Sequence, residues 1–211
     1  MIALFPAAAM FGGDPQPETS WCADPRDCRY VEEIPVRIGD EMFAMRVNAE
    51  VPFVTPQEGL TIMLGESVVI RLDDDLPVVE SSGPASEVVN QRAAQQAAEA
   101  LANSGPVDES LATPMTGPAV AVQDATADRV RLTFFQVEGS DETVLVIQNG
   151  YAEKLGLRAH MRTPLGEGRE YTTTCEILPW LLSLEHWPEP IVFIQLSDFA
   201  FSPDDRRVAC D

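Results

Sequence analysis

The chain of 211 residues has few basic side chains and no long apolar run. It carries 14 basic residues against 34 acidic ones, and Lys154 is the single lysine. The formal charge of −20 repels phosphate backbones, so we expect no nucleic-acid partner. No apolar stretch reaches the roughly 18 residues of a membrane-spanning helix, so we expect no membrane span.

Known catalytic motifs are also missing. The chain has no GxSxG nucleophile elbow, no SxxK pair, no GxGxxG loop and no Walker A loop. Two histidines leave few general bases. We therefore expect no cofactor, and the balance is against an enzyme, although carboxylates brought together by folding would leave no linear motif.

The four cysteines stand in two separate regions. Cys22 and Cys28 flank ADPRD, and Cys175 and Cys210 bound the last segment. We predict the disulfides Cys22–Cys28 and Cys175–Cys210 out of the three possible pairings. In the chain-entropy model, closing a loop of about 36 residues contributes roughly 4 kcal/mol and closing one of about 7 residues roughly 2.4 kcal/mol. A zinc site from Cys175, Cys210 and His186 is the weaker alternative, because no CxxC or HxxxH pair is present, and we expect no metal.

The N-terminal segment MIALFPAAAMFGGD resembles the end of a secretory signal. A short apolar region leads to Ala7, Ala8 and Ala9, which suit a cleavage site, although a basic region is missing before it. We expect residues 1–20 to be signal-like or disordered. Disulfides persist where no reductant acts, so the two features together predict a periplasmic or secreted protein.

Apolar residues that alternate between turn residues predict an antiparallel β fold. Residues 31–38 and 42–51 flank Gly39-Asp40, and a second pair of strands is expected over 60–64 and 67–72. Later strands are expected over 129–137, 143–148, 151–163, 170–175 and 191–201. Asn149-Gly150 has the composition of a type I′ turn, so we expect it to join its two flanking strands as a hairpin.

The middle of the chain differs in composition. Residues 85–102 are rich in Ala and Gln with apolar residues at helical spacing, which predicts one α-helix, and residues 103–120 contain three prolines and are expected to be a linker. We predict one antiparallel β-sandwich over 21–211, with the helix and the Pro-rich stretch inserted at 81–120, and an immunoglobulin-like strand order is one option. The alternative is two small β domains, 21–80 and 121–211.

The segment CEILPWLLSLEHWPEP, residues 175–190, concentrates chemically interesting side chains. We expect a single helical turn over 180–185, with the apolar residues capping the sandwich. Trp180, Glu185, His186 and Trp187 are candidate binding residues, because an exposed aromatic surface suits a protein or carbohydrate partner. A hydrolase that uses carboxylates and His186 is a further alternative.

A second candidate site is basic. Arg158, His160 and Arg162 share one face of an expected strand, because side chains alternate between the two faces. If Arg129 and Arg131 lay on a neighbouring strand, the result would be a stripe that binds an anion or an acidic partner. The alternative is a purely structural role, in which these basic residues form ion pairs with the abundant carboxylates. Acidic runs such as Asp73–Asp75 do not match the calcium-loop pattern, although a calcium- or anion-responsive module stays an alternative.

The function expected from these observations is binding or assembly. We expect a non-catalytic exported protein of the cell envelope that contacts a protein partner through sheet edges or through the Trp-rich loop. The sequence predicts neither the partner nor the oligomeric state.

Overall fold

The computed structural model describes residues 22, 24, 26–85, 127–164, 166, 170–203 and 209–210. This part of the chain is mainly β, and its paired strands are antiparallel. The strands are β1 (Cys28–Ile38), β2 (Glu41–Pro52), β3 (Val54–Thr55), β4 (Gly59–Met63), β5 (Glu66–Asp73), β6 (Leu76–Pro84), β7 (Val130–Gln136), β8 (Thr143–Asn149), β9 (Lys154–Arg162), β10 (Glu170–Thr172), β11 (Leu182–Trp187) and β12 (Phe193–Ser202). The signal-like residues 1–20, the linker 103–120 and the helix 85–102, apart from Ala85, lie outside the described residues.

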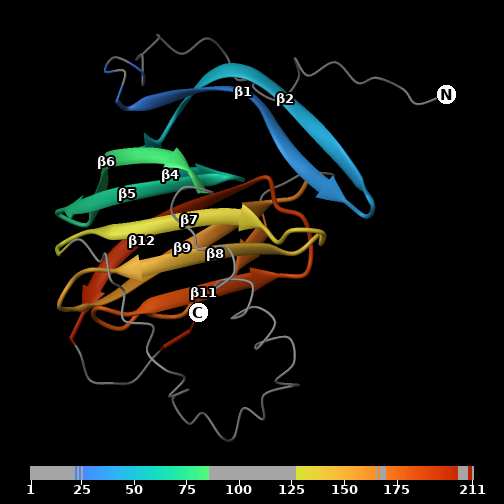
Figure 1. The fold of residues 1–211 in the computed structure, drawn as a ribbon. Coiled ribbons are helices and arrows are strands. Elements are labelled where there is room, and N and C mark those ends of the chain that lie inside the picture. Colours follow the sequence, from blue (N-terminus) through green and yellow to red (C-terminus); the bar gives the residue numbers. More distant parts are fainter. Residues whose placement is uncertain are drawn as a thin grey trace, which may run out of the picture.

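Two five-stranded sheets and one two-stranded hairpin make up the fold (Figure 1). One sheet has the order β10-β9-β12-β4-β3, and the other has the order β11-β8-β7-β5-β6. Strands from before and after residue 100 share both sheets, since β4 pairs with β12 and β5 pairs with β7. The hairpin β1–β2 forms a separate unit that crosses the sheets at the top of Figure 1.

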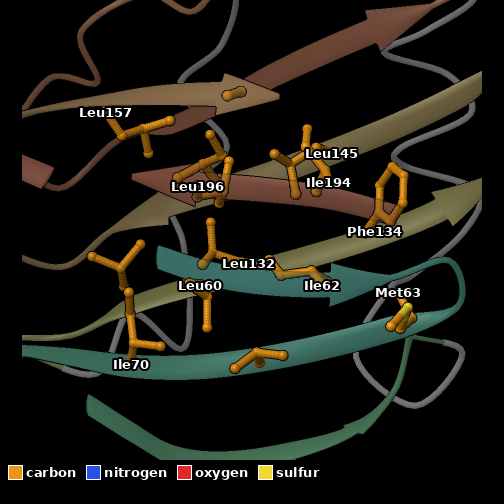
Figure 2. Close-up of a cluster of buried hydrophobic side chains, with 14 of the residues drawn as sticks. Leu60, Ile62, Met63, Ile70, Leu132, Phe134, Leu145, Leu157, Ile194 and Leu196 are labelled. Carbon is orange, nitrogen blue, oxygen red and sulfur yellow. The ribbon is translucent and has the colours of Figure 1, made fainter. Parts of the chain in front are cut away.

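The core lies between the two five-stranded sheets. Side chains from β4, β9 and β12 meet side chains from β5, β7 and β8 in a single buried cluster (Figure 2). Leu60, Leu132 and Ile194 are fully buried there. The alternation of apolar residues along each strand produces this two-sheet, sandwich-like arrangement, because every second side chain points to the same side of a sheet.

Gly59 is required where β4 meets β12. Its φ is +73°, and a Cβ atom at this position would lie 2.2 Å from the carbonyl oxygen of Leu196. Any other residue would push the two strands apart, because the obstacle is backbone and cannot rotate away.

The expected hairpin of residues 60–64 and 67–72 is wrong. Both strands exist, but β4 belongs to one sheet and β5 to the other. The short turn between them is a corner at which Leu64 N–H donates to Val192 O and Gly65 N–H donates to Phe134 O. Turn residues mark a change of direction, but they do not distinguish a hairpin from a change of sheet.

The expected Asn149-Gly150 hairpin is wrong for the same reason. β8 pairs with β7 and β11, whereas β9 pairs with β10 and β12. Asn149 is 1% exposed, and its side-chain amide donates to the carbonyl oxygens of Glu153, Ile177 and Leu178. The asparagine is therefore a buried hydrogen-bonding centre where the chain crosses between sheets.

The expected helical turn over 180–185 is a strand instead. After a turn at Pro179 and Trp180, residues of β11 pair in register with β8, from Leu182 opposite Gln148 to Trp187 opposite Thr143. β8 would otherwise leave one row of backbone groups unpaired, and the alternating segment LSLEHW supplies their partners.

Candidate functional site

The Trp-rich loop does not gather its four candidate residues into one surface. Trp180 is 47% exposed and has a φ of +59°, which places it at the bend before β11. Trp187 is buried in the core, and its indole Nε1–H donates to Thr172 Oγ1 at 2.8 Å. The two indoles thus have different surroundings, one exposed and the other buried.

Glu185 and His186 point to opposite faces of β11, because neighbouring strand residues alternate. Burial raises the pKa of Glu185, while hydrogen bonds from the Cys175 backbone and Ser183 act in the opposite direction. His186 Nε2 lies 3.4 Å from Glu142 Oε2, at a geometry that makes no hydrogen bond. The structure therefore does not bring the carboxylate and the imidazole of this pair together.

The basic residues of β9 share a face as expected. Arg158 lies 3.5 Å from Asp198, and the ring of His160 contacts Tyr171 edge-on with a centroid distance of 5.6 Å. The condition for extending this stripe is not met, because Arg131 lies on β7, which belongs to the other sheet. Arg162 completes the face but is only partly exposed.

A hollow of about 450 Å³ lies beside the disulfide Cys175–Cys210. Its polar lining includes Arg158, Asp198 and Glu176. Glu176 accepts hydrogen bonds from Lys154 Nζ and Ser202 Oγ, which hold the pKa of this carboxyl below its ordinary value. These polar groups satisfy one another. In the described part of the chain, no group of three or more His, Cys, Asp or Glu side chains could hold a metal ion.

Both expected disulfides are present. Cys22 pairs with Cys28 at the start of β1, and Cys175 pairs with Cys210 near the C-terminus. The two bonds are consistent with an oxidising location.

The β1–β2 hairpin is anchored at its base by a buried ion pair. Arg29 Nε lies 2.5 Å from Glu66 Oε1, and the guanidinium also donates to Thr61 O and lies 4.3 Å from the centre of the Phe53 ring. Burial raises the pKa of Glu66 and lowers that of Arg29, although each charge favours the ionised form of the other. The base of the hairpin is thus fastened to the corner between β4 and β5.

The tip of the hairpin is fastened to the end of β7 and to the loop that follows it. The Gln136 side chain bonds both the backbone N–H and the carbonyl oxygen of Arg37, and the Asp141 carboxylate accepts from Gly39 N–H at 2.8 Å. Gly39 has a φ of +62°, which suits the tight turn predicted at Gly39-Asp40. The hairpin therefore rests on the sandwich at both ends (Figure 1).

β2 presents a long strand edge that no other described strand pairs with. The other outer strands are less suited to accept a new strand. β3 and β10 have two and three residues, and β6 carries Pro77 and Pro84. The outer strand β11 has six residues without a proline, but all of them are at least partly buried. β1 contains Pro35, and the Gln136 side chain occupies part of its edge. From Glu41 to Arg46, in contrast, β2 runs in regular register against β1 without a proline.

The buried face of the hairpin continues outward to this edge. Val36 lies opposite Phe43 and Ile34 lies opposite Met45, and directly opposed residues share a face. Ile34 and Val36 are at most 2% exposed, Met45 is partly buried and Phe43 is 45% exposed. The apolar face is thus covered on β1 and uncovered at the outer side of β2.

The hairpin is predicted from the sequence, but Phe43 and Met45 are not among the predicted site residues. A signal was present, because Met42, Phe43, Ala44 and Met45 are consecutive apolar residues where a half-buried strand would alternate. Both faces of this stretch therefore carry apolar side chains, and Met42 is 59% exposed on the opposite face.

Comparison with known proteins returned no match: no family model, no curated protein and no solved structure is similar to this chain. Among the described residues, no helix is both long enough and apolar enough to cross a membrane.

Proposed function

We propose that this chain is a non-catalytic protein-binding module that pairs the edge of β2 with an extended segment of a partner polypeptide. The observation that carries the proposal is the regular run Glu41–Arg46, whose outer edge no described strand occupies. An added strand would bond the outward backbone groups and cover the Phe43 side chain. The antiparallel sandwich would then serve as the scaffold that holds this edge in place.

The two anchors of the hairpin support this function. A strand edge binds a segment with less loss of entropy when it is already extended and held in place. The Arg29–Glu66 pair holds the base, and Asp141 and Gln136 hold the tip. The hairpin is therefore organised for pairing before a partner arrives.

We place this module outside the cytoplasm, in the periplasm or cell envelope. Support comes from the two disulfides and from the signal-like segment MIALFPAAAMFGGD. The hydrolase and carbohydrate alternatives have less support, because Glu185 and His186 point to opposite faces and Trp187 is buried.

The test is a selection of random peptides on the purified, oxidised protein. We expect enriched peptides with β-branched and apolar residues at alternate positions, which bind the wild type and lose binding to Phe43→Lys. Lysine on an exposed strand edge disfavours the addition of a further strand. Leu76→Lys is the matched control, since Leu76 is 68% exposed on the outer strand β6, whose second and last residues are proline.

Both variants must keep the unfolding midpoint of the wild type. We expect this because Phe43 and Leu76 are both exposed, and exposed substitutions change stability little. Two results would show that the β2 edge is not the binding site. Either no peptide is selected, or the selected peptides bind Phe43→Lys as well as they bind the wild type.

A further inference from the structure

The strands β6 and β7 run parallel to each other, because both pair antiparallel with β5, which lies between them. The chain therefore leaves β6 towards one end of the sheet and enters β7 from the other end. The register shows this offset, since Pro84 lies opposite Glu66 whereas Val130 lies opposite Ile70. Parallel strands of one sheet need a crossover connection, and residues 86–126 form that connection here.

Both ends of this connection are fixed at opposite ends of β7. Ala85 donates its N–H to Gly65 O, and Gly65 N–H donates to Phe134 O near the end of β7. Asp128 N–H donates to Gly150 O just before β7 begins. The connection therefore has to run back along the sheet over about 20 Å, the length of a strand of this size.

The inner face of this sheet has no room for the connection. Val68, Leu132 and Leu145 are fully buried there in the core cluster, against the side chains of the other sheet. Protein cores are close-packed, so another chain segment does not fit between the two sheets. The outer face is the short path that remains.

The outer face of the same sheet is apolar. Residues that lie opposite one another across β11, β8, β7 and β5 share this face, and its apolar members are Val69, Phe135, Val144, Val146, Leu182 and Leu184. Val144 is 1% exposed and Val146 is 7% exposed, although neither belongs to the core cluster. The outer face thus has a buried apolar strip of its own.

The outer face of the other sheet differs in character. A row of opposed polar residues crosses it, namely Thr61, Gln195, His160 and Tyr171. A sheet face in contact with water carries polar side chains, whereas an apolar face is packed against another layer. The contrast indicates that the face with Val144 is the one that is covered.

Three buried polar atoms on this apolar face have no hydrogen-bond partner among the described residues. They are Arg131 Nε, Gln148 Oε1 and His186 Nε2, and Arg131 lies directly opposite Gln148. Arg131 Nε–H is a donor and Gln148 Oε1 is an acceptor, and buried polar atoms are rarely left unpaired. A covering segment with both donors and acceptors would satisfy them.

We infer that residues 86–126 of this chain dock on the outer face of the sheet β11-β8-β7-β5-β6 and cover Val144 and Val146. The inference is independent of the proposed pairing at β2. The crossover supplies the path, the apolar strip supplies the surface, and the unpaired polar atoms supply the positions that the segment satisfies. The molecule then has a third layer on the far side of this sheet.

The first part of the segment has the composition that this surface requires. The sequence predicts a helix over 85–102, with Val89, Ala93, Ala97 and Leu101 towards one side. A helix of this length spans about 27 Å, enough to run back along β7. Its small apolar side chains allow close approach to a sheet, and its glutamines carry both donors and acceptors.

The experiment measures where the segment lies in the full, oxidised chain. All four cysteines form disulfides, so Gln95→Cys can carry a single nitroxide label on the polar side of the predicted helix. We expect the amide signals of Thr133 and Val146 to lose most of their intensity in nuclear magnetic resonance spectra. Arg158 and Gln195 should keep theirs, because the two sheets lie about 10 Å apart and the label is on the far side.

Two alanine substitutions test which side of the segment makes the contact. Ala93→Asp in the labelled chain is expected to restore the Val146 signal, because an apolar surface accommodates a carboxylate poorly. Ala98→Asp is the matched control, since it introduces the same group five residues later, on the other side of the predicted helix. It should leave the loss of signal unchanged, and the other amide signals report whether each variant is folded.

Three results would overturn the inference. Signal loss confined to β9 and β12 would place the segment on the other sheet, and no loss in any described strand would show that it does not dock. Equal effects of Ala93→Asp and Ala98→Asp would contradict contact through the apolar side. A labelled chain is also mixed with an unlabelled, isotope-enriched chain: signal loss in the enriched chain would assign the segment to a second copy, whereas unchanged signals support docking within one chain.

Discussion

At the scale of single residues, the two tryptophans around β11 show how one loop divides its side chains. Trp187 lies in the core and donates to Thr172, whereas Trp180 remains 47% exposed. Composition favours a single site in this loop, but Trp180 lies at the turn before β11 and Trp187 is the last residue of that strand. Residue type alone could not predict this division.

Trp187→Phe is expected to lower the free energy of unfolding by about 1–2 kcal/mol, because it removes a buried hydrogen bond and some core volume. Trp180→Phe should change the free energy of unfolding by less than about 0.5 kcal/mol, since its site is exposed. Urea unfolding followed by circular dichroism measures both values. Equal losses would contradict the burial of Trp187.

Glu185→Gln is expected to raise stability at about pH 7 and to lose most of that advantage at about pH 4. Burial raises the folded-state pKa of Glu185 above its unfolded value. The carboxyl group therefore favours folding below the unfolded pKa, and this contribution is lost as pH rises through the folded pKa. Unfolding at both pH values, with exposed Glu189→Gln as the control, tests the sign; a wild type more stable than Glu185→Gln at neutral pH would contradict it.

At the scale of elements, the hairpin β1–β2 depends on contacts that are distant in sequence. Arg29 joins Glu66, and Gly39 joins Asp141. No local sequence motif marks either contact. The two strands could therefore be predicted from the sequence, but the residues that anchor them to the sheets could not. The hairpin itself was predictable, because Gly39-Asp40 lies between two strand-forming runs.

Arg29→Met is expected to lower the free energy of unfolding by about 3–5 kcal/mol, because it leaves the buried Glu66 carboxylate without its cation. The double variant Arg29→Met/Glu66→Leu should recover much of this loss, since two apolar side chains leave no unpaired charge. Chemical unfolding of these two variants, of Glu66→Leu and of the wild type measures the coupling. Additive losses would show that the two side chains do not act as a pair.

Sheet membership is the part of the fold that the sequence did not predict. The runs at 60–64, 67–72 and 143–148 were located correctly, yet the turns after 60–64 and after 143–148 lead into the other sheet. Hydrogen bonds decide the outcome: the Asn149 side chain donates to the nearby Glu153 carbonyl and to the carbonyls of Ile177 and Leu178, which are distant in sequence. β6 has nine residues but is not predicted from the sequence, because Pro77 and the polar run Glu80–Ser82 interrupt its apolar alternation. β11 is short and lies between prolines, which favours a turn over a strand in the sequence.

At the scale of the whole molecule, both sheets combine strands from the two ends of the chain. The pairs β4–β12 and β5–β7 support one domain over 21–211, which stays a prediction beside the two-domain alternative. The immunoglobulin-like strand order also stays a prediction. The mainly β, antiparallel architecture followed from the alternation of apolar residues and was confirmed.

Removing the two disulfides separately is expected to destabilise the chain unequally. Cys175→Ser/Cys210→Ser should lower the free energy of unfolding by about 4 kcal/mol and Cys22→Ser/Cys28→Ser by about 2.4 kcal/mol, because the first bond closes the longer loop. Denaturant titrations of the two double variants test the order. A larger loss from the Cys22–Cys28 pair would show that anchoring of the hairpin base outweighs loop length.

The central claim is that the edge of β2 is open in the free chain and pairs with an extended segment of a partner polypeptide. Hydrogen exchange of the amides of Met42–Val47, followed by nuclear magnetic resonance with and without a peptide selected on the oxidised protein, tests it most directly. We predict fast exchange at alternate residues of the free strand, whose N–H groups point away from β1, and strong protection of those amides with peptide bound. Slow exchange at all of these amides in the free chain, or no added protection in the complex, would contradict the claim.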